Sequence, residues 1–365
     1  MMHDWRQQLH ALLPGVRVTR VKGLADFVLG MAWARTVSLP EVARALPGVA
    51  NVPSRERRLR RWLANPAIDV ATLWDPLVTS MLAGEQGKEV LLVLDPTPQA
   101  GHATVLVLGL VRHKRVLPLA WRSVPQQEDW PASQKDLFQD LFAQVAARLP
   151  ADTTVTLLAD RGLTSADLLD LCAEVGWECV LRLSADARQG ASVRLVDGTT
   201  CPVWDLVSGP GQLWTGEVAL FQRQGWRTVQ LTISWPRGQA APWLLVSTRA
   251  AGRARVREYR RRFQAESTYQ DEKGRGWGLS RSKVVDLARL DRLLLVLVLV
   301  LWWVHAWGLR VIRSGLRRRY DRRDRRDLSV LRLGWLWMEE QMEQGRVPPV
   351  LFRYLHGHWR VRWAS

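Results

Sequence analysis

Residues 259–273, YRRRFQAESTYQDEK, are the stretch around which the rest of the chain is interpreted. If they form an α-helix, Tyr259, Arg262, Glu266 and Lys273 lie within about 60° of one another around its axis, because successive residues turn by about 100°. That face carries one carboxylate, two cations and a phenol, which suits a solvated helix face and not a core face. A glycine-rich segment follows, so we expect the helix to end just past Lys273.

The polar face of this helix has two possible interpretations. A single acid among cations can hold a metal ion while the cations hold phosphate groups. An ordinary basic helix with a solvated face explains the same residues without any ligand. Residues 259–273 alone do not decide between these interpretations, so the rest of the sequence is needed to decide.

Length and charge narrow the class of protein. The 365 residues leave room for two or three domains and a sizeable core. The chain has 52 Lys and Arg residues against 35 Asp and Glu residues, a net charge of +17. This excess implies a polyanionic partner, either nucleic acid or an acidic membrane surface. The 20 tryptophans are available for packing or for stacking on bases.

The cysteines and the N-terminus indicate the compartment. Cys172, Cys179 and Cys201 are an odd number without a C-x-x-C spacing. This pattern argues against a disulfide framework and a zinc site, and it suggests a reducing compartment. Residues 1–15 contain no apolar segment typical of a signal peptide, so we predict none.

The N-terminal region is expected to be helical. Apolar residues recur at helical spacing in residues 23–35 and 38–46, where Ser38 suits the N-cap and Pro40 the first turn. A third helix is predicted over residues 54–65, SRERRLRRWLAN, which is rich in arginine. Three short helices with a basic third helix could form a helix-turn-helix that docks on DNA. A small helical bundle with a solvated cationic face is the alternative.

From residue 89 the pattern changes to short apolar runs typical of strands. Three strands come first, with the first pairs antiparallel and His113 and Lys114 at a turn. A helix, a strand, a second helix and a last strand follow. We predict these elements over residues 89–97, 103–111, 114–124, 134–148, 154–162, 165–176 and 178–183. Asp95 and Asp160 close two of the apolar strands, and strand ends are where an α/β sheet places ligand-binding residues. A turn or cap is the more ordinary role of a lone aspartate.

The second half of the chain has three further patterns. Residues 184–248 contain Asp-Gly and Gln-Gly turns between alternating strands, so we expect a small β-rich insertion that ends in a strand over residues 243–248. The apolar run at 293–304 is short for a membrane span, and we expect a helix buried against the sheet. The charge run at 310–326 is either a solvated tail or a contact to the DNA backbone.

Taken together, these residues resemble a known family. Three acids follow the order of the DDE triad of transposases: Asp95, Asp160 and Glu266. The spacing Tyr259-x2-Arg262-x3-Glu266-x6-Lys273 is similar to the YREK signature of the insertion-sequence-four family of bacterial insertion sequences.

The flanks of the signature agree with the same family. ADRG at 159–162, GWGL at 276–279 and RLRRWLAN at 58–65 resemble segments of that group. The resemblance covers roughly residues 20–310. Relatives carry an aromatic residue, often Trp, directly after the signature arginine. Phe263 holds that place here, so aromatic stacking is expected to survive the change.

The resemblance implies an RNase H-like α/β fold, with a mixed β-sheet core flanked by helices, an inserted β-rich subdomain and an N-terminal helical domain. We expect a helical DNA-binding domain at 1–80 and a catalytic core in two parts, 81–183 and 249–310. The β-rich insertion would occupy 184–248, and a basic helical tail would follow at 311–365.

The resemblance also assigns roles to residues. The residues implied as catalytic metal ligands are Asp95, Asp160 and Glu266. They would bind two ions of Mg²⁺ or Mn²⁺ about 4 Å apart, and oxygen ligands suit both metals. The residues implied to contact DNA are Tyr259, Arg262, Lys273, Trp243 and Phe263. Trp243 matches the aromatic that receives a flipped base in relatives, although a tryptophan of the strand core is the alternative.

The function implied by the resemblance is metal-dependent cut-and-paste excision and integration of an insertion sequence through a DNA hairpin. The implied partners are double-stranded DNA, as terminal inverted repeats and target, and a second copy of the chain in the synaptic complex. A prokaryotic cytoplasmic location at the nucleoid, without a membrane, follows. A domesticated DNA-binding protein without catalysis and an RNase H-like nuclease are the alternatives. The intact acids speak against the first, and the large insertion and tail speak against the second.

Overall fold

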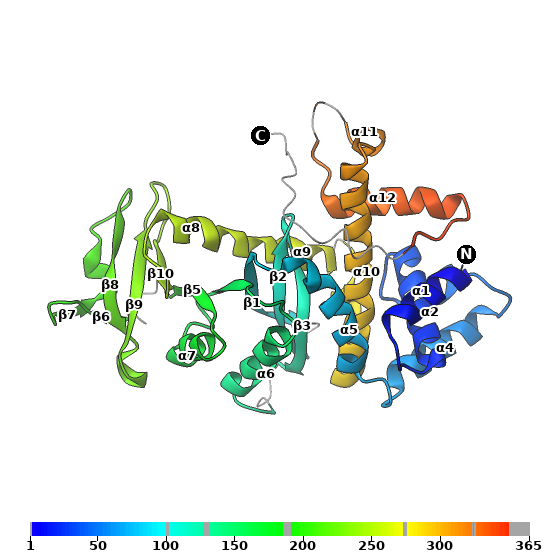
Figure 1. Cartoon of the computed structure of the whole chain (residues 1–365), viewed down its shortest axis with the longest axis horizontal. Helices are drawn as coiled ribbons and strands as arrows, with labels where there is room; N and C mark the ends of the chain where they lie inside the picture. The colour runs from blue at the N-terminus through cyan, green and yellow to red at the C-terminus, as the bar shows by residue number, and fades with distance from the viewer. Residues whose placement is uncertain are drawn as a thin grey trace.

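The computed structural model describes residues 2–99, 102–126, 131–184, 191–272, 276–322, 324 and 326–349. The molecule is elongated, with a β-rich end, a central sheet and a helical end (Figure 1). The long helix α10 (Leu287–Arg313) stands between the central sheet and the helices α1 (Met2–Leu12), α2 (Val18–Ala34) and α4 (Val52–Ala64).

Five helices precede the first strand. They are α1 (Met2–Leu12), α2 (Val18–Ala34), α3 (Leu39–Ala45), α4 (Val52–Ala64) and α5 (Val70–Leu82). Side-chain caps begin two of them, since Asn51 accepts a hydrogen bond from the Ser54 N–H and Asp69 accepts one from the Thr72 N–H. Helices α2, α3 and α4 confirm the three predicted helices. The apolar spacing did not predict α1 or α5, and α5 contains Pro76, a residue that usually ends a helix.

Five strands form the central part of the sheet. They are β1 (Glu89–Gln99), β2 (Ala103–Arg112), β3 (Arg115–Pro125), β4 (Thr154–Ala159) and β5 (Glu178–Leu183). Their order is β3-β2-β1-β4-β5, with β1, β2 and β3 antiparallel and β4 and β5 parallel to β1. This arrangement confirms the predicted RNase H-like mixed sheet. The predicted turn at His113 and Lys114 joins β2 to β3, with φ angles of 45° and 65°.

The strands after residue 191 continue this sheet. They are β6 (Ser192–Arg194), β7 (Thr200–Pro202), β8 (Leu213–Leu220), β9 (Arg227–Ser234) and β10 (Trp243–Ser247). Strand β10 pairs antiparallel with β5, and the order β10-β9-β8-β6-β7 completes a sheet of ten strands. The predicted turns place Gly198 and Gly225 at φ angles of 87° and 89°, which glycine adopts without strain.

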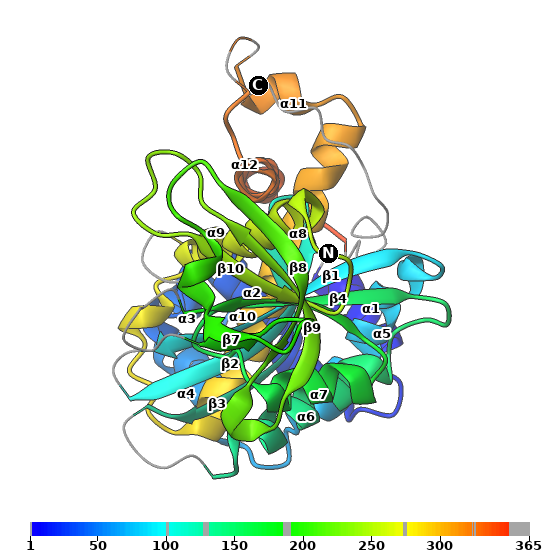
Figure 2. The same cartoon turned by 90° about the vertical axis from the view of Figure 1, so that its left-hand side faces the viewer.

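Helices cover both faces of the central sheet (Figures 1 and 2). Helices α6 (Gln134–Ala146) and α7 (Ala166–Glu174) lie on one face. Helix α8 (Arg253–Tyr259), the 3₁₀ turn η5 (Arg260–Phe263) and helix α9 (Gln264–Glu272) cross the other face. An apolar cluster lies between this second layer and the strands: Leu91, Val93, Val111, Val116, Leu158, Val180, Leu245, Val256, Tyr259 and Ala265.

The prediction of one regular α-helix from Tyr259 is wrong, because η5 interrupts it. A 3₁₀ turn eclipses residues i and i+3 and so places Arg262 directly above Tyr259. The Arg262 Nε–H donates to the Tyr259 hydroxyl at 3.2 Å, a contact that this geometry favours. The same turn rotates the residues that follow, so Glu266 is not on the face that Tyr259 and Arg262 share.

Helix α10 accounts for the apolar run at 293–304. By length and composition it is the one helix within the described residues that could cross a membrane, but 89% of its apolar window is buried inside the protein. It packs against β3, α2 and α12 (Val330–Glu343), which confirms the predicted buried helix. The short helix α11 (Arg317–Tyr320) lies between α10 and α12. The remaining 3₁₀ turns are η1 (Ala83–Glu85), η3 (Val203–Leu206), η4 (Gln222–Gln224) and η6 (Leu279–Arg281).

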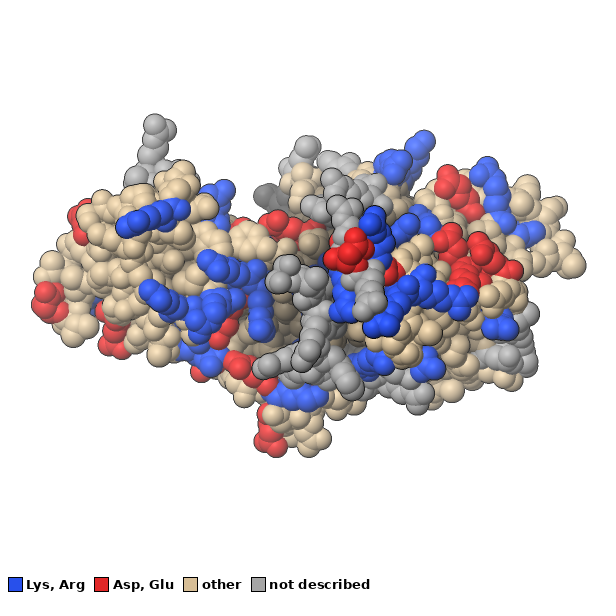
Figure 3. Space-filling model, turned by 90° about the horizontal axis from the view of Figure 1, so that it is seen from above, with Lys and Arg blue, Asp and Glu red and all other residues tan. Residues whose placement is uncertain are grey.

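Basic side chains gather on the outer side of the α8 layer. Seen from above, Lys and Arg residues cluster over this part of the surface (Figure 3). The exposed arginines of α8 and η5 are Arg253, Arg257, Arg260 and Arg261. Arg255 and Arg262 are buried on the inner side. The layer therefore presents one basic surface to solvent and a second set of cations to the sheet.

Candidate active site

Asp95 and Asp160 come from neighbouring strands of the central sheet. Asp160 directly follows β4, as predicted. Asp95 does not end its strand, because β1 continues to Gln99 beside β2. The parallel pairing of β1 with β4 does end there, at Leu94 opposite Ala159. Both aspartates therefore follow the last residue pair of two adjacent parallel strands, where the strands separate and side chains become accessible.

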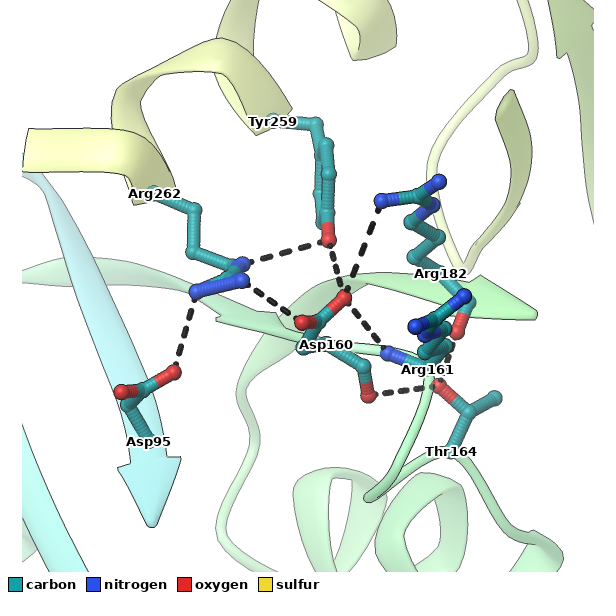
Figure 4. Close-up of polar contacts among 7 residues, drawn as sticks. All are labelled: Asp95, Asp160, Arg161, Thr164, Arg182, Tyr259 and Arg262. Atoms are coloured by element: carbon teal, nitrogen blue, oxygen red, sulfur yellow. Dashed lines mark hydrogen bonds and ion pairs between the residues drawn. The ribbon is translucent and has the colours of Figure 1, made fainter. Parts of the chain in front are cut away.

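Arg262 joins the two aspartates (Figure 4). Its Nη1–H donates to Asp95 Oδ1 at 3.0 Å, and its Nη2–H donates to Asp160 Oδ2 at 2.7 Å. The Arg262 side chain is only 7% exposed, so solvent screens these ion pairs weakly. The structure thus brings together three of the predicted site residues, because Asp95 and Asp160 both contact the guanidinium of Arg262.

Tyr259 completes this group from the helix above. Its hydroxyl donates to Asp160 Oδ1 at 3.1 Å and accepts from the Arg262 Nε–H. Burial raises the pKa of Tyr259 to about 12, although the Arg262 cation opposes this effect. The phenol is therefore protonated at neutral pH and remains a hydrogen-bond donor to Asp160.

Asp160 is held in its ionised form. Burial alone would raise the pKa of its carboxyl group, but the hydrogen bond from the Arg161 N–H and the charge of Arg262 outweigh this effect. The pKa of Asp160 consequently lies below the ordinary value. An ionised carboxylate is the form that a divalent cation or a charged donor requires.

Three residues at this site were not singled out from the sequence. The Arg182 Nη1 lies 4.0 Å from Asp160 Oδ1, and the Arg161 N–H donates to the same carboxylate at 2.8 Å. The Thr164 hydroxyl donates to the Arg182 backbone carbonyl at 2.7 Å. The sequence signal for Arg182 is that it is the one charged residue among the apolar residues 179–183 of β5, which is unusual for a central strand.

Glu266 is not part of this group. It is exposed on α9, and within the described part of the chain no three His, Cys, Asp or Glu side chains lie close enough to hold a metal ion. Lys273, the last residue of the predicted signature, lies outside the described residues. The assignment of Glu266 and Lys273 to the site stays a prediction.

Trp243 and Phe263 lie beside the aspartates. The Trp243 ring stacks on Phe263 with centroids 5.5 Å apart and packs edge-on against Tyr259 at 5.4 Å. The Arg182 guanidinium lies 5.8 Å from the Trp243 ring centroid. Trp243 is only partly buried, so the aromatic group borders the acidic pair and keeps some contact with solvent.

Residues 133–303 match the family model described as Transposase DDE domain. The matched range includes Asp160 and Glu266 and begins after Asp95. No curated protein matches the chain. The match spans 171 of the 365 residues, and it makes this part of the chain similar to the DDE domain of transposases, the enzymes of DNA transposition and recombination.

DDE transposases use divalent metal ions, and two of the predicted donors fit such an ion. Asp95 and Asp160 direct carboxylate oxygens at one shared cation, the Arg262 guanidinium. Carboxylate oxygens are the ligands that Mg²⁺ and Mn²⁺ prefer. The third predicted donor, Glu266, would have to join them from one turn farther along the helix.

Proposed function

We propose that this chain is the transposase of a bacterial insertion sequence of the insertion-sequence-four type. It would cut its element out of one DNA site through a hairpin intermediate and insert it at another. One observation carries the proposal: Asp95 and Asp160 both contact Arg262, which belongs to the signature segment 259–273. The match to the transposase DDE domain supports DNA transposition in general.

Each residue of the candidate site would have one task in strand cleavage. A divalent ion pair would activate the attacking water or 3′-hydroxyl and stabilise the leaving oxygen. Asp95 would hold both ions, Asp160 one of them and Glu266 the other. Tyr259, Arg262 and Lys273 would contact phosphates beside the scissile bond, as cations and hydroxyls commonly do.

Hairpin formation would use the aromatic group. Closing a hairpin requires a base outside the stack, and an aromatic side chain lowers the cost of extruding it. Trp243 borders the aspartates and Phe263 stacks on it, so an extruded base could lie on either ring. Arg182 lies within 4.0 Å of Asp160 and 5.8 Å of the Trp243 ring centroid, and it would contact the adjacent phosphate.

Two basic surfaces support a duplex DNA partner, and they lie on the outer side of α8 and on α4. Helix α4 exposes Arg57, Arg58, Arg60 and Arg61. Three of these arginines line a hollow together with Lys283, just before α10, and Arg289, in the first turn of α10. Terminal inverted repeats and target DNA would bind such surfaces through their phosphates, and two copies of the chain would hold two element ends.

The test uses duplex ends from the DNA on either side of the gene, labelled at one strand, with the full chain in Mg²⁺ or Mn²⁺. Asp95→Asn and Asp160→Asn should abolish cleavage and leave DNA binding nearly intact. Asp170→Asn is the matched control, because Asp170 pairs with Arg227 away from the site and should cleave like wild type. Cleavage by both site variants at the wild-type rate would refute the assignment.

Lys273→Ala gives a second test of the signature. It should weaken cleavage more than binding, because it would be one DNA contact among many but close to the chemistry. An unchanged cleavage rate would remove Lys273 from the site.

A DNA-binding protein without catalysis is the second candidate, and one observation favours it. Glu266 is exposed and apart from the aspartates that it should join. The same assay decides between the two, because a silent protein binds element ends and cleaves none in either metal.

A further inference from the structure

The guanidinium of Arg262 takes the place between two carboxylates where a shared metal ion would bind. It contacts Asp95 Oδ1 and Asp160 Oδ2, and it is nearly fully buried. Two carboxylates that face each other without a cation repel, so this contact stabilises the pair. Asp160 Oδ1 already accepts from Tyr259 and the Arg161 N–H. A divalent ion ligated by both aspartates would therefore compete with Arg262 for the carboxylates.

The turn that carries Arg262 is overwound. Residues in a 3₁₀ turn advance by about 120° and those in an α-helix by about 100°, so the four residues of η5 add about 80° of rotation. In a regular helix Glu266 would share a face with Tyr259 and Arg262. In the structure Tyr259 and Arg262 are buried and Glu266 is exposed.

A hydrogen bond fixes the far side of this turn. Thr268, fully buried on α9, accepts from the Val116 N–H at 2.9 Å. Val116 lies on β3, one of the two edge strands, and no strand of the described residues pairs with its outward N–H groups. Helix α9 is thereby held in the orientation that turns Glu266 to solvent.

We propose that Arg262 is a positioning residue that holds the aspartate pair until a divalent ion binds, and that its release lets η5 relax to an α-helix and turns Glu266 toward Asp160. The inference rests on the proposed function. Hydrogen bonds in a 3₁₀ turn have poorer geometry than in an α-helix, so the turn needs the Arg262 contacts to persist. Relaxation moves α9 relative to β3 and breaks the Thr268–Val116 bond.

We test whether Arg262 and a metal ion compete for the aspartates by measuring the metal affinity of the full chain without DNA. Mn²⁺ binding is measured by the loss of the free-ion electron paramagnetic resonance signal. Arg262→Gln should bind Mn²⁺ about tenfold more tightly than wild type, because its amide does not hold both carboxylates as a cation. Arg261→Gln is the matched control: it removes the same charge from an exposed neighbour and should stay within about twofold of wild type.

The outcomes separate this inference from the proposed function. Unchanged or weaker Mn²⁺ binding by Arg262→Gln overturns the positioning role while the metal site stands. No Mn²⁺ binding by any of the three proteins refutes the metal site and the proposed function with it. Arg262→Lys covers the case in which the glutamine variant unfolds, since a single ammonium cannot span both carboxylates as the guanidinium does and should give intermediate tightening.

Recruitment of Glu266 has its own measurement. Glu266→Gln should weaken Mn²⁺ binding about tenfold both in wild type and in the Arg262→Gln background. Hydrogen–deuterium exchange on the wild-type chain should show faster exchange of the Val116 amide after Mn²⁺ is added, because its Thr268 acceptor moves away. Unchanged Val116 exchange together with unchanged affinity of Glu266→Gln would contradict the rotation.

Discussion

At the scale of the residue, Trp243 could either receive an extruded base or pack in the protein core, and an experiment can distinguish these two roles. The ring packs on Phe263 and Tyr259, as a core residue would, yet it is partly exposed beside the aspartates. Base stacking on an aromatic contributes about 1–3 kcal/mol. Loss of a buried tryptophan costs about 3–5 kcal/mol of folding stability.

Trp243→Ala should slow hairpin formation about 10- to 100-fold and leave the first nick unchanged, because only the hairpin needs an extruded base. The measurement follows nicking and hairpinning on a labelled end beside a melting curve. Trp235→Ala is the control, since Trp235 is also partly buried and packs edge-on against Trp204 in the insertion. Equal loss of both steps with a lower melting temperature would assign Trp243 to the core, and Phe263 would be the next candidate for the base.

Asp291 is a partly buried acid at the contact between α10 and β3. Its Oδ1 accepts from the Ser123 hydroxyl at 2.6 Å and from the Ser123 N–H at 3.2 Å. Burial raises the pKa of Asp291 to about 6, although the Ser123 hydrogen bonds and nearby arginines oppose this shift. The folded protein thus binds this proton more tightly than the unfolded chain. This tighter proton binding adds to the free energy of unfolding. The contribution is fully present below about pH 4 and is lost as the pH rises through about 6.

Asp291→Asn should therefore stabilise the protein at pH 8 by about 1–3 kcal/mol, because the amide keeps an acceptor for Ser123 and carries no buried charge. At pH 4 the two proteins should have nearly equal stability, since the wild-type carboxyl group is then protonated. Urea unfolding at both pH values measures the difference. An equal gain at both values would point to packing instead of ionisation.

At the scale of the element, two glycines set how closely α10 and α12 cross. A Cβ atom on Gly308 would lie 1.9 Å from the Val330 carbonyl oxygen, and one on Gly334 would lie 1.9 Å from that of Val304. The crossing brings Trp307 and Trp337 into a parallel stack with centroids 3.7 Å apart. The close contact between the helices therefore requires glycine at positions 308 and 334, although alanine has the higher helix propensity.

Gly334→Ala should destabilise the protein by at least about 1–3 kcal/mol, the usual cost of overpacking, although alanine favours the helix itself. Gly209→Ala is the matched control, because a Cβ there meets nothing within 4 Å and the backbone is unstrained. Thermal unfolding followed by circular dichroism gives both values. A variant at Gly334 as stable as the one at Gly209 would show that the two helices separate at little cost.

At the scale of the whole molecule, the net charge of +17 is spread over separate surfaces. One lies on α4 and another on the outer side of α8. These surfaces belong to the helical end and to the layer above the central sheet, so a duplex held by both would pass along the length of the molecule (Figure 1).

DNA binding should weaken by about 10³-fold or more between 50 and 200 mM salt if six or more phosphates are neutralised. Changing Arg57 and Arg61 to glutamine should reduce the slope of log affinity against log salt by about 2, one for each lost phosphate contact. Arg227→Gln, which removes a charge already paired with Asp170, should leave the slope unchanged. Fluorescence anisotropy over a salt series measures these slopes, and equal slopes for all three proteins would remove α4 from the DNA surface.

The sequence by itself determined the elements of the central sheet and the residues that could carry chemistry. Apolar runs predicted β1 to β5 because a strand's pattern depends on its own neighbours in sequence, and the turn at His113 and Lys114 followed for the same reason. Asp95, Asp160 and the spacing from Tyr259 to Arg262 were readable because they are short motifs.

Only the tertiary structure decided how these parts meet. The pairing of β10 with β5, which merges the insertion into the central sheet, joins backbone groups distant in sequence. Arg262 lies between Asp95 and Asp160, and Glu266 faces solvent, because contacts across the sheet overwind the turn between them. A period of 100° per residue describes an isolated helix, whereas the long-range ion pairs and the Thr268 hydrogen bond favour the turn that this helix adopts.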